Sequence, residues 1–495
     1  MYASGADLQS INPLITVHPL AKAVQKHVLF LTLASYDSTF TPTPRLARWN
    51  WSRSRTRLTL KLRPDVTWHD GVPTRAADVV WTLNMARDPS VAYPRARDLA
   101  SVRTIREVDS LTVRIQFVRP QPRFPDVLTD LAVLPAHRFV DVQPADVRRA
   151  EFNLRPVGNG PFEFVEYRPN ERWIFRRSER FPVDMGRPEI RQFVVVVVDE
   201  AATKLAALTS GELDFAGISP AHADFVRQDE RLQVIDYPLQ LVYAIVWNLR
   251  RRLFEDVKVR RALTMALDRQ VMVDAYVHGF GTVADGPVAP EHPWFTAVQH
   301  LQYDTAGAKR LLREAGWSMG EDGVLLKNGR RFEFNLLTVG SGDVLLEEMI
   351  QAQLRDVGIE VHIKQFELAS FLAVAQSRER NFDALVTGLP GDFSLGFVAA
   401  SFGSVNPGPL AYSGYASAEF DRTMNDVRTA KTEEALKLAW EKAQRILAED
   451  QPVTWLYHAH GLQGASRRIN HARIDYRGEL AAISEWRIVR PDGAR

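Results

Sequence analysis

Residues 58–83 have the sequence LTLKLRPDVTWHDGVPTRAADVVWTL. The first five residues alternate between leucine and a polar residue, which is typical of a β-strand with one buried face. His69-Asp70-Gly71 indicates a tight turn, because aspartate and glycine accept the backbone angles of a turn. Thr74 can cap a helix that the apolar residues of 79–83 indicate, and Ala77 leaves that helix without a reciprocal capping box. The segment therefore predicts a strand, a turn and a helix in succession.

Strand and helix patterns alternate along the rest of the chain. Alternating or continuous apolar runs predict further strands at 111–117, 162–167, 194–198 and 332–336. Caps and helical spacing of apolar residues predict helices at 27–34, 199–209, 256–277 as the longest, 304–315, 343–357 and 432–449. This interleaving, without a repeat or a long linker, favours α/β domains.

The composition bounds the class of protein. The chain has 495 residues, 45% of them hydrophobic and 25% charged, which fits a soluble protein of two to four domains. The net charge of +2 does not point to a nucleic acid as partner. There is no cysteine, which excludes disulfides, thiolate metal sites and cysteine nucleophiles. Lys22 and Lys26 precede an apolar stretch at 27–34, but a polar lead comes first, so we interpret this stretch as an amphipathic helix and expect an export leader to have been removed.

Sequence motifs for catalysis or metal binding are weak. Gly158-Asn159-Gly160 is followed by a proline where a phosphate loop would present N–H groups, so we interpret it as a turn before a strand. His458-Ala459-His460 would place two imidazoles on one face of a strand, as a metal pair or as locally hydrogen-bonded histidines. No nucleophile elbow, zinc-protease or Walker sequence occurs. We therefore predict no catalytic residue, no metal site and no cofactor.

Four segments, in order along the chain, resemble one family. They are residues 60–83, quoted above, then PVGNGPF at 156–162, FEDVKVRRAL at 254–263 and AEDQPVTWLYH at 448–458. These segments are similar to the signature segments of the family 5 extracellular solute-binding proteins, the dipeptide, oligopeptide and nickel receptors of ABC importers. The resemblance covers nearly the whole chain.

The resemblance implies an α/β, bilobed fold of the periplasmic-binding-protein type (type II, cluster C), with an additional domain inserted in the first lobe. Domain I, the first lobe, would comprise residues 1–47, 156–246 and 465–495. Domain II would be the insertion at 48–155, and domain III, the second lobe, would be 247–464. Such a receptor closes about a hinge when a ligand bridges both lobes, and it needs no catalytic residue.

The resemblance also implies a ligand-binding residue, Asp392. Peptide-binding members carry a Gly-Trp-x-x-Asp segment whose aspartate binds the α-ammonium group of the peptide, and residues 388–392, GLPGD, occupy the matching place. Leu389 replaces the tryptophan, which leaves room for another ligand, and Asp392 could instead cap its own loop. The other residues expected at the ligand are Thr16, Val17, His18, Tyr93, Trp247, Leu389, Gly391, Phe393 and Tyr412. Trp247 could equally belong to the core.

The function implied is that of an extracytoplasmic receptor that captures a peptide or another small solute in the cleft between its lobes and delivers it to the permease subunits of an ABC transporter. We expect a monomer that is periplasmic, or extracellular and membrane-associated. One alternative is a nickel or metal-chelate receptor, for which His18, His458 or His460 would have to converge. An oligosaccharide receptor of the same fold and a carboxylate-dependent hydrolase also stay open.

Overall fold

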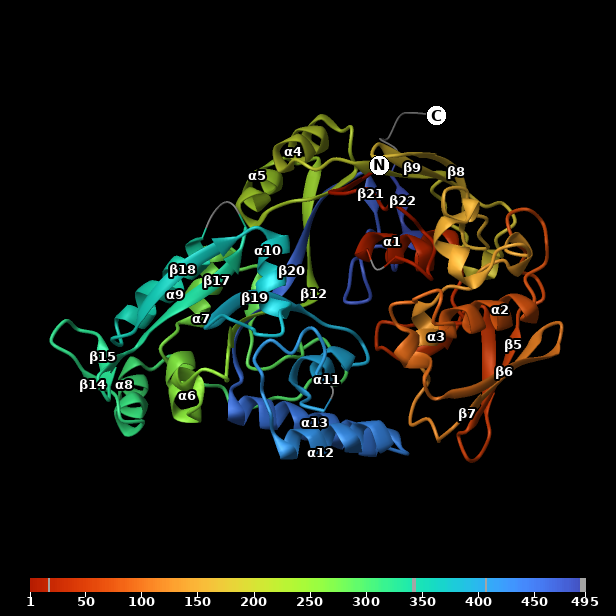
Figure 1. Ribbon diagram of the computed structural model, residues 1–495. Coiled ribbons are helices and arrows are strands. Elements are labelled where there is room, and N and C mark those ends of the chain that lie inside the picture. Colours follow the sequence, from red (N-terminus) through yellow and green to blue (C-terminus); the bar gives the residue numbers. More distant parts are fainter. Residues whose placement is uncertain (17, 341–343, 406, 490–495) are drawn as a thin grey trace. The chain divides into compact units, whose positions relative to one another are not determined.

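The computed structural model describes residues 1–16, 18–340, 344–405 and 407–489 (Figure 1). The chain forms two compact units. Unit 1 comprises Met1–Tyr237 and the chain from Gly461 onward, and unit 2 comprises Pro238–His460. The chain passes between the units within strands β12 (Leu232–Trp247) and β20 (Val453–Ser466). The predicted domain borders at 246/247 and 464/465 fall in the same two strands, and the three-domain division stays a prediction.

The main sheet of unit 1 combines parallel and antiparallel strands. Its strands are β1 (Tyr2–Ser4), β8 (Phe162–Arg168), β9 (Arg172–Arg177), β10 (Gln192–Val197) and β11 (Phe215–Gly217). β1 lies parallel to both β10 and β11, while β9 lies antiparallel to β8 and β10. Helices α4 (Ala201–Ser210) and α5 (Ala223–Gln228) follow β10 and β11 in the chain. The predicted strands at 162–167 and 194–198 and the predicted helix at 199–209 are confirmed.

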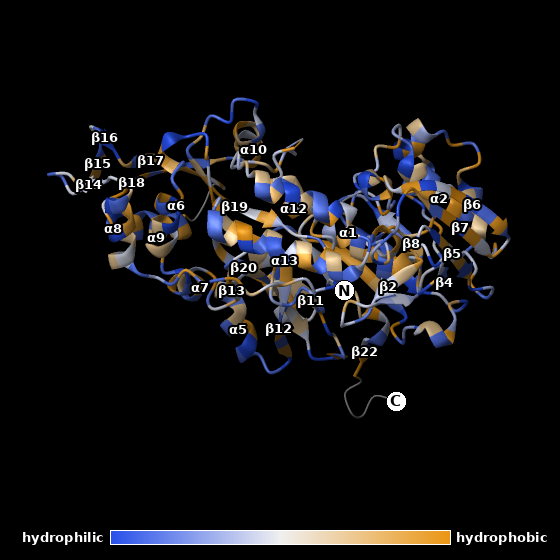
Figure 2. Cartoon of the chain, turned by 90° about the horizontal axis from the view of Figure 1, so that it is seen from below, coloured by the Kyte–Doolittle hydropathy of each residue, from blue (hydrophilic) through white to orange (hydrophobic). Residues whose placement is uncertain are grey.

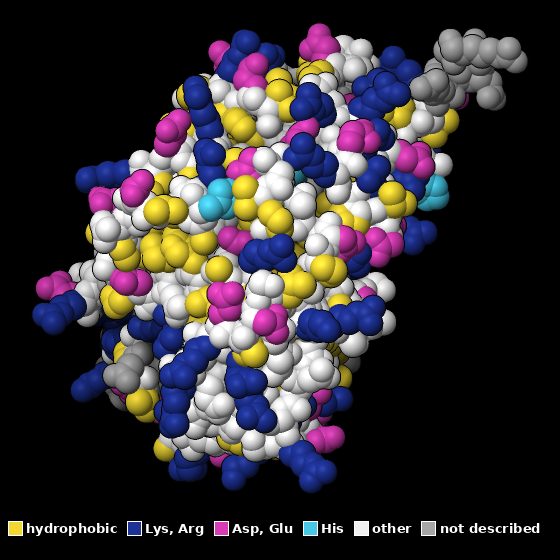
Figure 3. Space-filling model, turned by 90° about the vertical axis from the view of Figure 1, so that its right-hand side faces the viewer, with side chains coloured by type: hydrophobic (Ala, Val, Ile, Leu, Met, Phe, Trp, Pro, Cys, Tyr) yellow, Lys and Arg dark blue, Asp and Glu magenta, His cyan; other side chains and the backbone are white. Residues whose placement is uncertain are grey.

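A second, four-stranded sheet of unit 1 contains the alternating leucine segment of residues 58–62. Its order is β4 (Ala47–Trp51), β5 (Arg57–Leu62), β7 (Thr112–Phe117) and β6 (Val102–Asp109), all antiparallel. Leu58, Leu60 and Leu62 are buried, and the residues between them face outward, so the strands alternate in hydropathy (Figure 2). The buried face packs against α2 (Ala76–Arg87), and the opposite, polar face is exposed (Figure 3).

Asp78 caps α2, so the expectation that Thr74 caps this helix is wrong. The Thr74 N–H is donated to the Val66 carbonyl at 3.0 Å. The Asp78 carboxylate accepts the N–H groups of Arg75 at 2.8 Å and Ala136 at 2.9 Å. It also accepts the indole N–H of the fully buried Trp68 at 3.1 Å. The capping carboxylate is thus present one residue after Ala77, where the sequence pattern predicted none.

The Gly-x-Gly segment is a turn before a strand, as predicted. Gly158 and Gly160 press against the backbone of Leu29, where an added Cβ would lie 1.9 Å and 2.6 Å from backbone atoms. The Asn159 side chain accepts the Leu31 N–H at 2.9 Å, and strand β8 begins at Phe162. Only glycine allows this close approach, so the motif is structural.

The predicted helix at 27–34 is displaced toward the N-terminus. Helix α1 spans Pro19–Val24 and continues as a single π-helical turn, Gln25–Leu29. The chain is extended at Phe30 because the next N–H, that of Leu31, is taken by Asn159. Unit 1 also contains two short antiparallel strand pairs and one further α-helix. The strand pairs are β2 (Ala34–Tyr36) with β3 (Pro42–Pro44) and β21 (Ile469–Asn470) with β22 (Arg487–Ile488), and the helix is α3 (Val127–Asp130).

The sheet of unit 2 has a parallel core. β17 (Glu333–Val339) lies parallel to β18 (Glu360–Phe366) and to β19 (Ala384–Pro390). Residues 241–247 of β12 lie antiparallel to β19. β13 (Gly281–Val283) pairs with β20, and a small sheet is formed by β14 (Ser318–Met319), β15 (Leu325–Lys327) and β16 (Arg330–Arg331). The strand predicted at 332–336 is confirmed, and it extends from Glu333 to Val339.

The helices of unit 2 are α6 (Val257–Met265), α7 (Arg269–Tyr276), α8 (Thr305–Glu314), α9 (Leu345–Arg355), α10 (Leu368–Gln376), α11 (Gly396–Phe402), α12 (Ala418–Thr429) and α13 (Glu433–Asp450). The single long helix predicted at 256–277 is wrong, because Asp268 starts a new helix by accepting the Val271 N–H at 3.1 Å. The Asp268 N–H itself is donated to Gln353 at 2.6 Å. Among the described residues, no helix combines the length and the apolar character needed to cross a membrane.

Candidate functional site

Three of the residues expected at a ligand in unit 2 follow the carboxyl end of a parallel strand. β17, β18 and β19 end at Val339, Phe366 and Pro390, and Gly391, Asp392 and Phe393 follow β19 directly. In open α/β sheets, ligands bind outside the carboxyl ends of the strands. The position of this loop therefore fits a binding role.

Asp392 is also the cap of its own loop. One carboxylate oxygen, Oδ1, accepts the N–H groups of Ser394 at 2.7 Å and Gly396 at 3.2 Å, together with the Ser394 hydroxyl. The other oxygen, Oδ2, accepts the Phe397 N–H at 3.2 Å. A carboxylate has about four acceptor positions, two on each oxygen, so one position on Oδ2 is left for a further donor. The loop-capping role and a role at the ligand are compatible on these grounds.

The other residues expected at the ligand in unit 2 differ in exposure. Leu389 is 2% exposed and Tyr412 5% exposed, and both side chains belong to an apolar core of unit 2. Phe393 is half-buried, and its ring stacks on His292 with 6.2 Å between ring centroids. Trp247 is fully buried among Phe254 and Phe334 and donates its indole N–H to Thr454 at 3.1 Å. In this conformation Trp247 is a core residue.

In unit 1, Thr16 and His18 belong to the segment that leads from β1 to α1. The Thr16 hydroxyl accepts the His18 N–H at 3.2 Å, and His18 Nδ1 accepts the Ala21 N–H at 3.3 Å, so His18 caps α1. Burial lowers the pKa of His18, while the carboxylates of Glu479 and Asp7 oppose that shift. Val17, the third residue predicted here, lies outside the described residues.

Tyr93, the remaining predicted residue, lies beside charged side chains that no local sequence pattern indicates. Tyr93 is 7% exposed, and its hydroxyl has no hydrogen-bond partner among the described residues. The pKa of its phenol is raised by burial and then by the negative charge of Asp130. Asp130 is the last residue of α3, which is far from Tyr93 in the sequence but close to it in the fold.

Three cationic side chains converge on Asp130, and we call these four residues the Asp130 cluster. Lys22 Nζ lies 2.6 Å and Lys26 Nζ 3.1 Å from the carboxylate, and the Arg95 guanidinium lies 2.7 Å from it. Burial alone would raise the pKa of Asp130, but the three cations hold it well below its ordinary value. The spacing of Lys22 and Lys26 by four residues was a visible signal, since it places both on one helical face. Nothing in the sequence linked them to Asp130.

Of the three histidines of the metal alternative, His18 caps α1, and His458 and His460 are on strand β20. His458 is 4% exposed, and burial lowers its pKa to about 4. His460 Nε2 lies 3.4 Å from the Thr282 hydroxyl. Within the described residues, the one group with metal-ligand spacing is Glu333, Glu360 and His362 at the opposite, amino ends of β17 and β18. The Arg331 guanidinium already lies 2.7 Å from Glu360 and 3.5 Å from Glu333.

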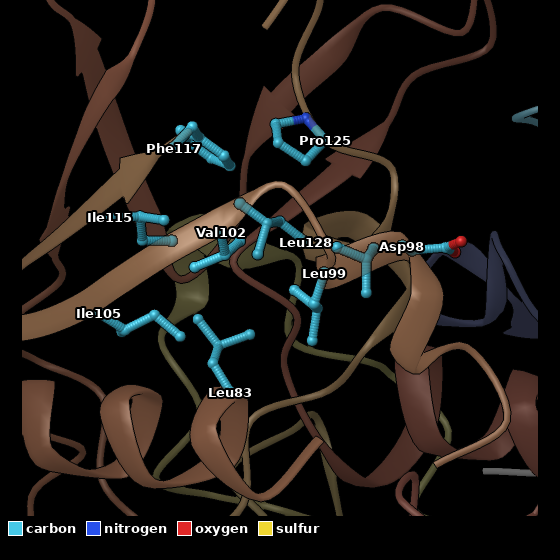
Figure 4. Close-up of a pocket in the computed structure, with 10 residues that line it drawn as sticks. Leu83, Asp98, Leu99, Val102, Ile105, Ile115, Phe117, Pro125 and Leu128 are labelled. Atoms are coloured by element: carbon cyan, nitrogen blue, oxygen red, sulfur yellow. The ribbon is translucent and has the colours of Figure 1, made fainter. Parts of the chain in front are cut away.

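A small pocket in unit 1 lies between α2, α3 and the four-stranded sheet (Figure 4). Apolar side chains line it, including Leu83 from α2, Ile105 from β6 and Phe117 from β7. Its volume is about 10 Å³, which is barely enough for one water molecule. This pocket is a packing gap in the core and cannot hold a solute.

Comparisons with known proteins agree with the family resemblance. The family model described as bacterial extracellular solute-binding proteins, family 5 Middle, matches residues 41–402. The oligopeptide-binding protein AppA of Bacillus subtilis is 28% identical over 438 residues, which are 86% of this chain and 80% of that protein.

Solved structures agree as well. The structure of AppA from Bacillus subtilis in complex with a nonapeptide has a TM-score of 0.80 at 25% identity and covers 99% of this chain and 98% of its own. NikA from Brucella suis, in complex with Fe(III)-EDTA, has a TM-score of 0.87 at 21% identity and covers 99% of both chains, which shows the fold alone. The predicted fold class and the predicted solute-receptor function are confirmed at this level. The chain belongs to family 5 of the bacterial extracellular solute-binding proteins.

Proposed function

We propose that the chain is the extracytoplasmic receptor of an ABC importer, that it works as a monomer without catalysis, and that its solute is a peptide or a similar small zwitterion. The observation that carries the choice of solute is the Asp130 cluster with Tyr93 beside it. The relative AppA of Bacillus subtilis is named for oligopeptide binding, which is consistent with this choice.

The two lysines of the Asp130 cluster have N–H donors that bind no acceptor among the described residues. An ammonium group has three N–H donors, and Lys22 and Lys26 each donate one hydrogen bond, to Asp130. The Tyr93 hydroxyl adds a further donor. The Arg95 guanidinium lies 2.7 Å from Asp130 and 2.6 Å from Asp98, so it bridges two carboxylates. A carboxylate of the solute would accept the remaining N–H donors of Lys22 and Lys26 in charge-assisted hydrogen bonds.

Asp392 supplies the complementary group for the ammonium end of the solute. Its carboxylate keeps one acceptor position after its loop contacts are counted, at the carboxyl end of β19. In Asp392→Asn, the remaining amide oxygen can keep the contacts of Oδ1 while the negative charge is removed. The affinity for a peptide should therefore fall by roughly 2 to 4 kcal/mol if Asp392 pairs with a buried ammonium. The affinity stays unchanged if Asp392 only caps its loop.

The test is calorimetric titration of the chain after unfolding and refolding have removed any co-purified ligand. The probes are a pool of tetrapeptides with free termini, the same pool with amidated C-termini and the same pool with acetylated N-termini. We expect the free pool to bind, and each modification to weaken binding by roughly tenfold or more, because it removes one charge-assisted contact. Lys22→Met should reproduce the effect of amidation and should leave the affinity for the amidated pool unchanged.

A matched control and two competing ligands make the test decisive. Lys258 forms an exposed pair with Glu314 at 3.1 Å, so Lys258→Met changes the same charge without touching the proposed contacts. Binding of Ni(II)–histidine or maltotetraose in place of all three peptide pools would replace the peptide proposal with the metal-chelate or oligosaccharide alternative. Binding of the three pools with equal affinity would keep the peptide receptor and refute both charged anchors.

A further inference from the structure

The outward face of the four-stranded sheet carries an unusual concentration of positive charge. Its basic side chains are Arg48 on β4, Arg57 and Lys61 on β5, Arg114 on β7 and Arg106 on β6, and we call these five the basic sheet face. All five are exposed. In Figure 3, basic and acidic side chains are mixed over the upper part of the view, and basic ones predominate over the lower part, where this sheet faces the viewer.

The strand register places like charges directly opposite each other. Arg48 pairs with Lys61 across β4 and β5, and Arg106 pairs with Arg114 across β6 and β7. Like charges at directly opposed positions destabilise a sheet. Two such pairs on one face therefore reduce stability, and no ion pair within the described part of the chain offsets them.

Among the described residues, none of the five basic side chains forms an ion pair or donates a side-chain hydrogen bond. The carboxylate of Asp109 lies at a corner of the face. Asp109 is opposite Thr112 and interacts electrostatically with Lys61. Its single negative charge offsets only part of the five positive ones. The face is thus complementary to a negatively charged surface outside the protein.

The composition of the face indicates what kind of surface fits. Between the basic residues, the outward positions are occupied by short or amide side chains such as Asn50, Thr59 and Gln116. Protein interfaces are enriched in aromatic side chains at their centre, and this face presents none. A basic face without an aromatic anchor matches a surface that is itself diffusely charged, such as the headgroup layer of anionic phospholipids.

We propose that the basic sheet face docks unit 1 reversibly onto a bilayer that contains anionic phospholipid. The attraction is electrostatic and comes from arginine and lysine side chains within reach of the lipid phosphates. It does not require a bound solute, and it is independent of the solute proposed above.

The test is co-sedimentation of the full chain with vesicles of 70% phosphatidylcholine and 30% phosphatidylglycerol, compared with vesicles of pure phosphatidylcholine. We expect binding to the mixed vesicles at 50 mM salt, no binding to the neutral ones, and release at 500 mM salt, because the Debye length shortens to a few ångströms. Binding to neither kind of vesicle, or equal binding to both, would overturn the proposal.

A charge-reversal variant separates lost binding from lost folding. Arg48→Glu with Arg106→Glu replaces both like-charge pairs by opposite-charge pairs, so the fold should melt at the same or a higher temperature. We expect its partition onto the mixed vesicles to fall roughly tenfold or more, because four units of charge are removed from the face. The control, Lys309→Glu with Arg310→Glu, makes the same charge change on exposed positions of α8 in unit 2 and should bind as the unmodified chain does.

Two outcomes would contradict the proposal that this face binds a membrane. If the unmodified chain is retained by immobilised polyglutamate and ignores the vesicles, the partner is an acidic polypeptide and the membrane proposal fails. If the α8 control loses vesicle binding as strongly as the sheet variant does, net charge alone governs binding and the sheet face has no special role.

Discussion

In unit 1 a carboxylate, Asp130, is held by three cationic side chains, whereas in unit 2 a guanidinium, Arg260, is held by backbone carbonyls. Arg260 is 5% exposed, and its three nitrogens donate to the carbonyl oxygens of Phe254, Glu255, Asp450 and Gln451 at 2.6 to 3.0 Å. Two of the partners of Asp130, Lys22 and Lys26, each donate a single hydrogen bond among the described residues. Arg260 stabilises the fold because it pairs with backbone carbonyls. The lysines beside Asp130 can in addition donate hydrogen bonds to a ligand.

The largest effect is expected at Arg260. Arg260→Met should lower the free energy of unfolding by about 3 to 5 kcal/mol, because four buried carbonyls lose their donor. Urea unfolding followed by tryptophan fluorescence measures the change. Arg252→Met, at an exposed arginine before α6, should change stability by about 0.5 kcal/mol or less. A similar small loss for both variants would show that the carbonyls find other donors.

His458 differs from both groups, because it is a buried imidazole that contacts no charged side chain among the described residues. Its pKa is about 4 in the fold and 6.5 in an ordinary environment, so the unfolded chain takes up the proton first as the pH falls. The contribution of His458 to stability is complete above pH 6.5 and is lost as the pH falls to about 4, a loss of about 3 kcal/mol. His458→Gln should lack this part of the pH profile in thermal unfolding. Parallel profiles for the two proteins would contradict the buried, neutral state.

Asp130 should give a smaller effect that depends on pH and salt. Asp130→Asn leaves three cations without their shared carboxylate and should cost about 2 kcal/mol near pH 7, less than a fully buried pair because the cations are partly exposed. The pKa of Asp130 is lowered by folding, so its contribution is complete above pH 4 and is lost as the pH falls further.

Urea unfolding at two pH values and two salt concentrations tests this dependence on Asp130. High salt should shrink the difference between the unmodified chain and the variant, since the cluster is in contact with solvent. The control is Asp224→Asn, which removes one partner of an exposed pair with Arg227 and should change stability by about 0.5 kcal/mol or less. A difference that is unaffected by pH would mean that the carboxylate acts only by hydrogen bonding.

The smallest change in stability is expected at Asp392. Asp392→Ala removes the cap of the loop before α11 and should cost about 1 kcal/mol, whereas Asp392→Asn should cost a few tenths because one oxygen is kept. Differential scanning calorimetry can resolve the two variants. Equal losses would show that the charge of Asp392, and not its acceptor geometry, stabilises the loop.

The candidate site could be predicted from the sequence only in part. Asp392 and Tyr93 were found through the family resemblance, and the structure places them after β19 and beside Asp130. The Asp130 cluster was missed because its members are far apart in the chain, at Lys22, Lys26, Arg95 and Asp130. Leu389 and Trp247 were expected at the ligand, and their burial depends on which strands pair, which no local pattern reveals.

The sequence by itself determined the alternating strands, most helices and the family, because periods of two and 3.6 residues reflect burial of one face of a local element. The tertiary structure alone decided where α1 ends and where the helix predicted at 256–277 breaks, because Asn159 and Gln353 take the N–H groups of Leu31 and Asp268. It also decided which charges meet. Arg106 faces Arg114 only through the register of two strands, and Asp130 meets its cations only through long-range packing. Such contacts depend on chain segments that no sequence window contains.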